Sequence, residues 1–253
     1  MDLVIGVGFI FTDDLMTLAA DYPNVRFAGV DLALRTDASG RPLPLPKNLA
    51  ALKFREEEGS FLVGALAALV GHSKKVGFVG GMDIPLIHKF EQGYRQGVLA
   101  VCPDCRVIAQ YAGATPEAFR NPSKGKELAL SQYQAGVNVI FHASGSTGLG
   151  VFEAARSTAK LAIGVDADQY GEAPGFILTS MTKGVDTAVY DTIVRTNDGT
   201  FDGGVYSFGL SEGGVGYVDD EHNRALIGDA ARARVEGLKR DIIEGRIRVE
   251  ITQ

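Results

Sequence analysis

The sequence predicts an α/β protein built on parallel sheets, and three observations support that prediction. Apolar runs of strand length alternate with helical patterns along the whole chain, an order that produces parallel strands joined by helices. The 32 glycines suit tight turns from strand to helix. The length of 253 residues lies above the usual size of one compact domain, so one large or two modest domains are expected.

Each element is identified by an apolar run and by the residues that begin or end it. The apolar residues 3–7 form the first strand, Thr12 or Asp13 caps the first helix, and Pro23 ends that helix. Residues 31–47 hold three closely spaced prolines and are expected to form an exposed loop. Strands are expected over 3–7, 25–30, 49–54, 75–79, 106–111, 137–142, 161–165, 177–180 and 206–210. Helices are expected over 13–21, 58–70, 87–101, 123–135, from the glycine-rich turn at 144–150 to 157, over 184–195 and over 230–244.

Composition and charge exclude several classes of protein. A chain that is 45% hydrophobic and 22% charged is ordinary for a globular protein, which excludes disordered and collagen-like chains. The net charge of −6 offers no general attraction to nucleic acid or to anionic lipid, so we expect no nucleic-acid partner. No apolar stretch reaches the roughly 18 residues of a membrane-spanning helix. The apolar run 3–11 lacks a basic flank and a cleavage site, so it is interpreted as a buried strand and not as a secretory signal.

The motifs of common enzyme classes do not fit this sequence. The turn Gly6-Val7-Gly8 is followed by Phe11, where a dinucleotide fingerprint needs a small residue. No tyrosine has a lysine four residues later, no serine lies in a nucleophile elbow, and no histidine or acidic residue has metal-ligand spacing. The dense patch 219–222 is interpreted as a solvated loop. We therefore expect no catalytic residue, no cofactor and no metal.

The two cysteines, Cys102 and Cys105, have the spacing of a redox motif but follow a helix instead of preceding one. A reactive thiolate is stabilised at a helix N-terminus, where the dipole favours negative charge. A local disulfide and a pair of inert thiols are the favoured interpretations, with redox catalysis and half of a metal site as lesser alternatives.

Polar and aromatic residues at the ends of the expected strands indicate a binding protein. Phe9 and Phe11 follow the first strand, where a ring could stack on a flat ligand or belong to the core. Asp166 follows an apolar strand directly, and Lys183 comes just after the next one. A carboxylate accepts hydrogen bonds from neighbouring hydroxyls, and a lysine donates to the same oxygens. Together with the glycine-rich turn, these residues predict a site for a polyol or a ribose.

Five motifs occur in order along the chain and give it a family resemblance. They are Val76-Gly77-Phe78-Val79-Gly80-Gly81-Met82-Asp83-Ile84-Pro85, Ser146-Thr147-Gly148-Leu149-Gly150-Val151-Phe152-Glu153-Ala154-Ala155, Ile163-Gly164-Val165-Asp166-Ala167-Asp168-Gln169, Leu178-Thr179-Ser180-Met181 and Glu212-Gly213-Gly214-Val215-Gly216. The set resembles the basic membrane protein (BMP) family of ABC-transporter substrate-binding lipoproteins, in its purine nucleoside receptor-like group.

The resemblance implies a type I periplasmic-binding-protein fold, with two α/β lobes joined by a three-stranded hinge that close on a nucleoside. It implies base stacking by Phe9 and Phe11, and ribose contacts from Gly145 and Ser146 through backbone N–H groups. Asp166 matches the ribose-hydroxyl acceptor and Lys183 the donor beside it. Three further residues complete the expected ligand-binding set, namely Met82, Asp83 and Ser144, the last at a position where some relatives place an aromatic ring.

The family pattern also begins earlier than this chain does. Relatives have a further strand–helix–strand–helix segment that carries an acidic/asparagine pair for the base edge, so the first lobe is expected to be truncated at its N-terminus. Residues 1–72 with 182–200 would form that lobe, and residues 73–181 with 201–253 the second. A truncated lobe would expose an apolar sheet edge through which chains could self-associate.

The function implied by the resemblance is that of the substrate-binding component of an ABC importer, which binds a nucleoside without transforming it. Its partners would be the nucleoside and the membrane permease, and the full-length form would be periplasmic or lipid-anchored outside the cytoplasm. The alternatives are a cytoplasmic ligand sensor or regulator of the same fold and, less favoured, an enzyme that processes nucleosides or nucleotides.

Overall fold

Strands and helices alternate along the chain in the computed structural model, which describes residues 2–37, 39, 41 and 43–252. The residues divide into two units. Unit 1 comprises Met1–Arg55 and Gly184–Gly214, and unit 2 comprises Glu56–Lys183 and Val215–Gln253. The chain therefore passes between the units three times, which is the connectivity expected of two lobes joined by a three-stranded hinge.

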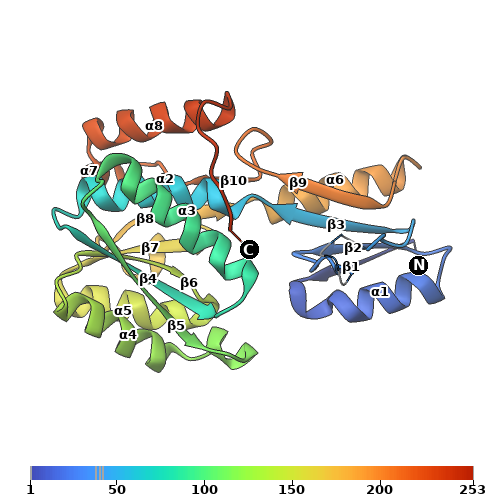
Figure 1. Ribbon diagram of the computed structural model, residues 1–253, viewed down its shortest axis with the longest axis horizontal. Coiled ribbons are helices and arrows are strands. Elements are labelled where there is room, and N and C mark those ends of the chain that lie inside the picture. Colours follow the sequence, from blue (N-terminus) through green and yellow to red (C-terminus); the bar gives the residue numbers. More distant parts are fainter. Residues whose placement is uncertain (1, 38, 40, 42, 253) are drawn as a thin grey trace. The chain divides into compact units, whose positions relative to one another are not determined.

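Unit 1 is a parallel sheet with a helix on each face. Its strands β1 (Leu3–Val7), β2 (Arg26–Val30), β3 (Leu49–Phe54) and β9 (Gly204–Phe208) lie in the order β1-β2-β3-β9. Helix α1 (Thr12–Asp21) packs on β2 and β3, and α6 (Val185–Asn197) covers the other face (Figure 1). The core of the unit is apolar, with Leu15, Ala19, Phe27, Leu32, Leu49 and Ala51 all buried.

Unit 2 contains the larger sheet, in the order β10-β8-β7-β6-β4-β5. Its strands are β4 (Lys75–Met82), β5 (Arg106–Gly113), β6 (Val139–Ala143), β7 (Leu161–Asp166), β8 (Ile177–Lys183) and the short β10 (Val215–Tyr217). All pair in parallel except β10, which runs antiparallel to β8. Because β5 and β6 lie on opposite sides of β4, the strand order reverses at β4, and ligands of such sheets bind at the carboxyl ends of strands near this reversal.

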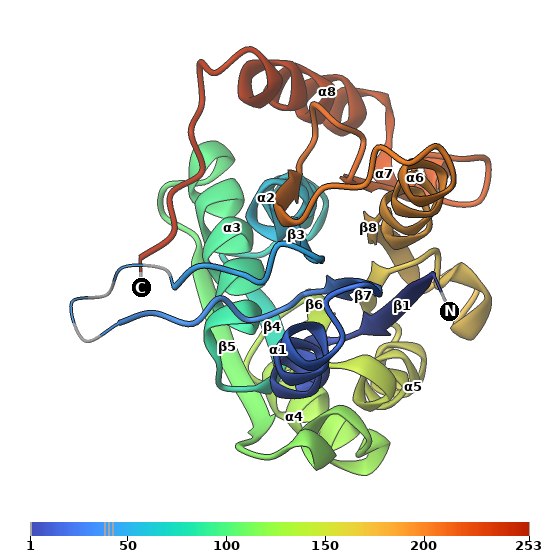
Figure 2. The same cartoon turned by 90° about the vertical axis from the view of Figure 1, so that its right-hand side faces the viewer.

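Helices cover both faces of this sheet. On one face lie α4 (Pro122–Gln134) and α5 (Gly148–Thr158), and on the other α2 (Glu56–Val70) and α3 (Pro85–Val101) (Figure 1). Helix α8 (Asp229–Ile243) packs on the outside of α2 and forms a further layer, preceded by the single turn α7 (Arg224–Ile227) (Figure 2). Within the described part of the chain, no helix combines the length and the hydrophobicity that crossing a membrane requires.

The α/β class and the expected strands and helices are confirmed, with ends that differ by a few residues. The described residues between Asp31 and Asn48 contain no helix and no extended strand, as the prolines predicted. The short elements β10 and α7 were not predicted, because three or four residues carry too little periodicity to be recognised.

The boundaries of the units differ from the expected lobes in three places. Residues 182–183 were expected in the first lobe but belong to unit 2, because they end strand β8. Helix α2 was expected in the first lobe but belongs to unit 2, because it packs on α3, α8 and β8. Residues 201–214 were expected in the second lobe but belong to unit 1, because β9 extends its sheet by pairing in parallel with β3 from Ala50↔Gly204 to Phe54↔Phe208.

Glycines allow α2 and α3 to pack with their backbones almost in contact. A Cβ atom at Gly93 or Gly97 of α3 would overlap the carbonyl oxygen of Glu57 or Phe61 on α2. Gly64 of α2 lies equally close to the carbonyl of Tyr94. The close packing sets the height of α2 above the sheet and therefore the position of its first residues, which lie near the carboxyl end of β8.

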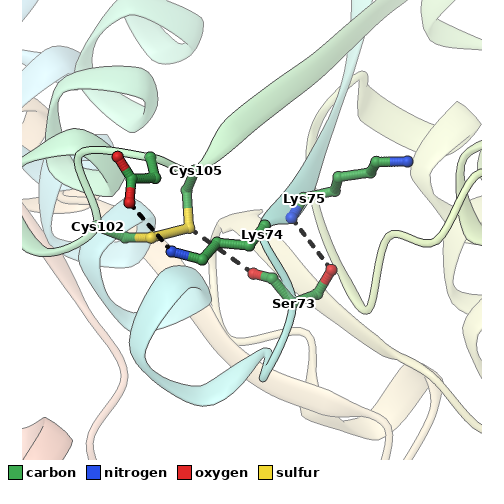
Figure 3. The surroundings of a disulfide bond; sticks show 6 residues. Ser73, Lys74, Lys75, Cys102 and Cys105 are labelled. Carbon is green, nitrogen blue, oxygen red and sulfur yellow. Dashed lines mark hydrogen bonds and ion pairs between the residues drawn. A yellow bond between two sulfur atoms is a disulfide. The ribbon is translucent and has the colours of Figure 1, made fainter.

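Cys102 and Cys105 form a disulfide in the turn between α3 and β5 (Figure 3). Lys74 reaches Asp104 across this turn at 3.4 Å, and the Cys105 sulfur contacts the Ser73 carbonyl at 3.8 Å. The disulfide selects one of the interpretations left open by the sequence. Its position at the C-terminal end of α3 disfavours a thiolate, which indicates a structural role.

Replacing Gly97 with alanine should destabilise unit 2 by about 2 kcal/mol or more, because the added methyl group forces α2 and α3 apart. Gly237 in α8 provides the matched control, since a Cβ there meets no atom within 4 Å. Gly237→Ala should instead stabilise by about 0.5–1 kcal/mol through helix propensity. Urea unfolding of both variants measures the change in the free energy of unfolding, which should fall for Gly97→Ala and rise for Gly237→Ala. Equal changes in the two variants would contradict the close packing.

Reduction of the disulfide should lower the free energy of unfolding by about 2 kcal/mol, since the bond closes a loop of only four residues. Urea unfolding with and without a reductant measures the difference. The double variant Cys102→Ser/Cys105→Ser should be equally destabilised and insensitive to reductant. Complete unfolding on reduction would contradict this expectation, because it would show that the bond stabilises more than the local turn.

Candidate functional site

The expected ligand-binding residues of unit 2 lie at the carboxyl ends of four neighbouring parallel strands. Met82 ends β4 and Asp83 follows it, the turn 144–146 follows β6, and Asp166 and Lys183 end β7 and β8. These strands are adjacent in the order β8-β7-β6-β4, so the fold brings to one sheet edge residues that span a hundred positions of the sequence. In register, Asp166 pairs with Thr182, which makes Lys183 the next residue along the neighbouring strand.

The turn after β6 exposes backbone groups at the start of α5. Gly145 has φ of 56°, a left-handed conformation that glycine adopts readily, and both Gly145 and Ser146 are exposed. The Ser146 hydroxyl donates to the carbonyl oxygen of Phe119 at 2.9 Å, and the Thr147 hydroxyl donates to that of Ala118 at 2.7 Å. These bonds fix the turn to the segment after β5 and leave backbone N–H groups at the helix start to bind polar ligand atoms.

Asp166 is held in an unusual backbone conformation. Its φ of 68° is left-handed, which costs a non-glycine residue of the order of 1 kcal/mol, and the residue is exposed at the end of β7. The conformation is fixed from both sides, because the Val165 amide donates to Oε1 of Gln169 at 2.7 Å and the Ala167 amide donates to the Val165 carbonyl at 2.8 Å. Strain of this kind is often found at functional sites.

A buried histidine supports this edge from below. Nε2 of His142 lies 3.1 Å from Oε1 of Gln169, and Nδ1 lies 3.3 Å from the Ser144 hydroxyl. Because Oε1 already accepts from the Val165 amide, Nε2 must carry the proton, and Nδ1 accepts from Ser144. Gln169 also receives support from β8, since its backbone amide donates to the Ser180 hydroxyl at 3.0 Å. The network therefore joins the carboxyl ends of β6, β7 and β8.

Two glycines make room for this network. A Cβ at Gly148 would overlap the His142 ring, and one at Gly164 would lie 2.5 Å from the Ser180 hydroxyl oxygen. Ser144 is fully buried, so its side chain supports the turn from within. Burial lowers the pKa of His142 to about 4, because the charged imidazolium would lose its hydration. The imidazole is therefore neutral at ordinary pH.

Lys183 is almost fully buried, with a side chain only 5% exposed. Its ammonium lies 3.1 Å from Oε1 of Glu56, the first residue of α2. The sequence placed Lys183 beside Asp166 but gave no sign of Glu56. Met82 is half-buried, and Asp83 is exposed and lies 2.6 Å from Nε2 of His88.

The two expected aromatic residues belong to unit 1. Phe9 and Phe11 form a short 3-10 helix directly after β1, where Gly8, with φ of 109°, allows the chain to turn. Phe9 is half-buried and Phe11 is 41% exposed, so neither belongs fully to the core. The Thr12 hydroxyl donates to the Phe9 carbonyl at 2.7 Å and fixes the turn.

Two further candidate residues were missed by sequence reasoning. Asp31 follows β2 in unit 1 with φ of 59°, the same left-handed conformation that Asp166 adopts in unit 2. Both end the tripeptide Gly-Val-Asp, at 29–31 and 164–166, and this repeat was the signal that could have found Asp31. Phe119 lies after β5, with its ring against Gly81 and its carbonyl beside Gly145, in a segment without clear periodicity.

The neutral imidazole predicts a pH dependence of stability. In the unfolded chain His142 takes up a proton near pH 6.5, whereas in the folded chain its pKa is about 4. Its contribution is therefore fully present above pH 6.5 and is lost progressively as the pH falls to 4, by about 3 kcal/mol in total. His142→Gln should remove this part of the pH dependence of the free energy of unfolding, measured with urea. The exposed His72 is the control, and an equal effect of His72→Gln would contradict the assignment.

Comparison with known proteins places this geometry in one family. Residues 1–252 match the Bmp family, described as "ABC transporter substrate-binding protein PnrA-like". A solved structure of ABC transporter system solute-binding proteins from Aeropyrum pernix K1 has a TM-score of 0.86 and 32% identity, covering 100% of this chain and 78% of that one. The type I periplasmic-binding fold is thereby confirmed.

Curated relatives agree with this match. The CD4+ T-cell-stimulating antigen of Listeria innocua is 36% identical over 98% of this chain and 70% of its own length. The ABC transporter nucleoside-binding protein BmpA of Lactococcus lactis is 32% identical over the same shares. Members of the family are extracytoplasmic proteins that bind a small ligand and deliver it to a permease, and they are not enzymes. The chain therefore belongs to the Bmp family of PnrA-like ABC transporter substrate-binding proteins.

Proposed function

We propose that this substrate-binding protein takes a nucleoside, whose ribose is held at the carboxyl edge of the unit 2 sheet. The observation that carries the proposal is Asp166, an exposed carboxylate fixed in a strained conformation between the glycine turn and the strand that ends in Lys183. The two oxygens of a carboxylate held in this position suit a ligand with two neighbouring hydroxyl groups.

The chemistry of this edge matches a ribose. The two oxygens of the Asp166 carboxylate accept hydrogen bonds, so they suit the adjacent 2′- and 3′-hydroxyls of the sugar. The exposed N–H groups of the Gly145–Ser146 turn donate to ribose oxygens, and the Lys183 ammonium donates beside them. Met82 and Asp83, at the end of β4, would flank the sugar on the side away from β7.

The base would be bound by aromatic rings, and a purine is favoured because it offers the larger stacking surface. On unit 1 the rings are those of Phe9 and Phe11, which the family resemblance indicates. On unit 2, the half-buried Phe119 would flank the base, since its ring lies against Gly81 and its carbonyl lies beside Gly145. The Lactococcus lactis relative, named as a nucleoside-binding protein, supports the same ligand class. We further propose that the exported form is anchored by lipid, as the resemblance implies.

Replacing Asp166 with asparagine should weaken the binding of inosine, adenosine or guanosine by about 2–3 kcal/mol, because a carboxylate acceptor is lost. Isothermal titration calorimetry measures the affinity. The same variant should discriminate less between a nucleoside and its 2′-deoxy analogue, since the lost contact is to a ribose hydroxyl.

Asp168→Asn is the matched control. Asp168 is exposed in the same loop, and its Oδ1 accepts from the Tyr170 amide at 3.0 Å, a bond that asparagine can keep. Its affinity should equal that of the wild type. Unchanged nucleoside affinity in Asp166→Asn, or no binding of any nucleoside by the wild type, would refute the proposed function.

A further inference from the structure

We infer that Glu56 is a positioning residue for ligand binding, which holds the ammonium of Lys183 in place at the carboxyl end of β8. The inference rests on the proposed function and deepens it, because it names a residue that acts on the ligand only through another side chain. Glu56 lies in none of the five motifs that carry the family resemblance.

The contacts of Glu56 place it between two lysines. Its carboxylate is 1% exposed, and Oε1 lies 3.1 Å from Nζ of Lys183. The other oxygen, Oε2, pairs with Lys89 of α3, which also lies 3.3 Å from Glu57. The contact between Lys183 and Glu56 is an ion pair.

Glu56 is ionised in this setting. Burial by itself would raise the pKa of its carboxyl group, but the ammonium groups of Lys183 and Lys89 outweigh burial and hold the pKa below its usual value. The position at the first turn of α2 also favours a negative charge, since the helix dipole is positive there. A fixed negative charge beside Lys183 in turn favours the protonated lysine, the form with three donors.

Packing and strand pairing hold the backbone on both sides of this pair. Gly59 lies one turn after Glu56, and a Cβ there would be 2.6 Å from the terminal carbon of Met181 on β8, so the start of α2 is pressed against the strand. Lys183 ends that strand and pairs in register with Val215 of β10. A lysine side chain is flexible, and fixing its position before the ligand arrives removes an entropic cost from binding.

A ligand-independent measurement tests the positioning itself. In the wild type, the side-chain ¹⁵Nζ signal of Lys183 should be observable by NMR at neutral pH, because a buried ion pair slows hydrogen exchange. In Glu56→Gln this signal should be lost. Glu57→Gln is the matched control, since Glu57 is buried in the same turn and pairs with Lys89, and it should retain the signal. Retention of the signal in Glu56→Gln would overturn the inference.

A double-mutant cycle then tests the effect on binding. Glu56→Gln alone should weaken nucleoside affinity by roughly tenfold to a hundredfold, measured by calorimetry. In a Lys183→Met background the same substitution should change affinity less than about twofold, because Glu56 acts only through the lysine. A purely structural role would weaken binding equally in both backgrounds and would overturn the inference, as would the absence of any effect.

Two controls keep the outcomes separate. Thermal unfolding checks that each variant is folded, and Glu56→Asp, which keeps the charge but withdraws it by one methylene, replaces Glu56→Gln if the latter does not fold. If the wild type binds no nucleoside, the proposed function fails, whereas the NMR comparison still decides whether Glu56 fixes Lys183.

Discussion

Gln169 makes the hydrogen bonds on which the geometry of the unit 2 edge depends. Its side-chain oxygen accepts from the backbone of β7 and from His142 of β6, and its own amide donates to Ser180 of β8. The bond from the Val165 amide to Gln169 acts together with the bond from the Ala167 amide to the Val165 carbonyl, and both bonds flank the left-handed conformation of Asp166. Gln169 and His142 also explain two glycines. A Cβ at Gly148 would overlap the His142 ring, and a Cβ at Gly164 would lie too close to Gln169 and the Ser180 hydroxyl.

A second support acts through helices instead of hydrogen bonds. The glycines between α2 and α3 allow these helices to pack closely. As a result, Glu56 at the start of α2 lies at the end of β8, where it contacts Lys183 and also pairs with Lys89 of α3. Buried ion pairs contribute little net stability, because desolvation offsets the attraction. Four charged side chains are nevertheless buried or nearly buried near the end of β8, namely Glu56, Glu57, Lys89 and Lys183. The placement of Lys183 explains their presence better than a gain in stability does.

Much of this could be predicted from the sequence, for physical reasons that differ between residues. Strand ends such as Asp166 and Lys183 were found because apolar runs mark strands and parallel strands share their carboxyl edge. Glu56 and Phe119 were not found, since a lysine's buried partner and a ring packed on a glycine depend on tertiary contacts without sequence periodicity. The strand that ends at Val30 was predicted, but Asp31 after it was not recognised, although it ends the same Gly-Val-Asp tripeptide as Asp166 and shares its left-handed conformation. The boundaries of the units depend on whether α2 packs on α3 or on β3, which periodicity does not encode.

The threefold passage of the chain between the units has a consequence for folding during synthesis. Unit 1 cannot complete its sheet until β9 has been made, about 150 residues after β3, its partner strand. Five of the six strands of unit 2 are synthesised in that interval, and they carry most of its core. Unit 2 is thus expected to begin folding while the edge of β3 in unit 1 is still unpaired. The pairing of β3 with β9 is expected to be slow and late, because the two strands are far apart in the sequence.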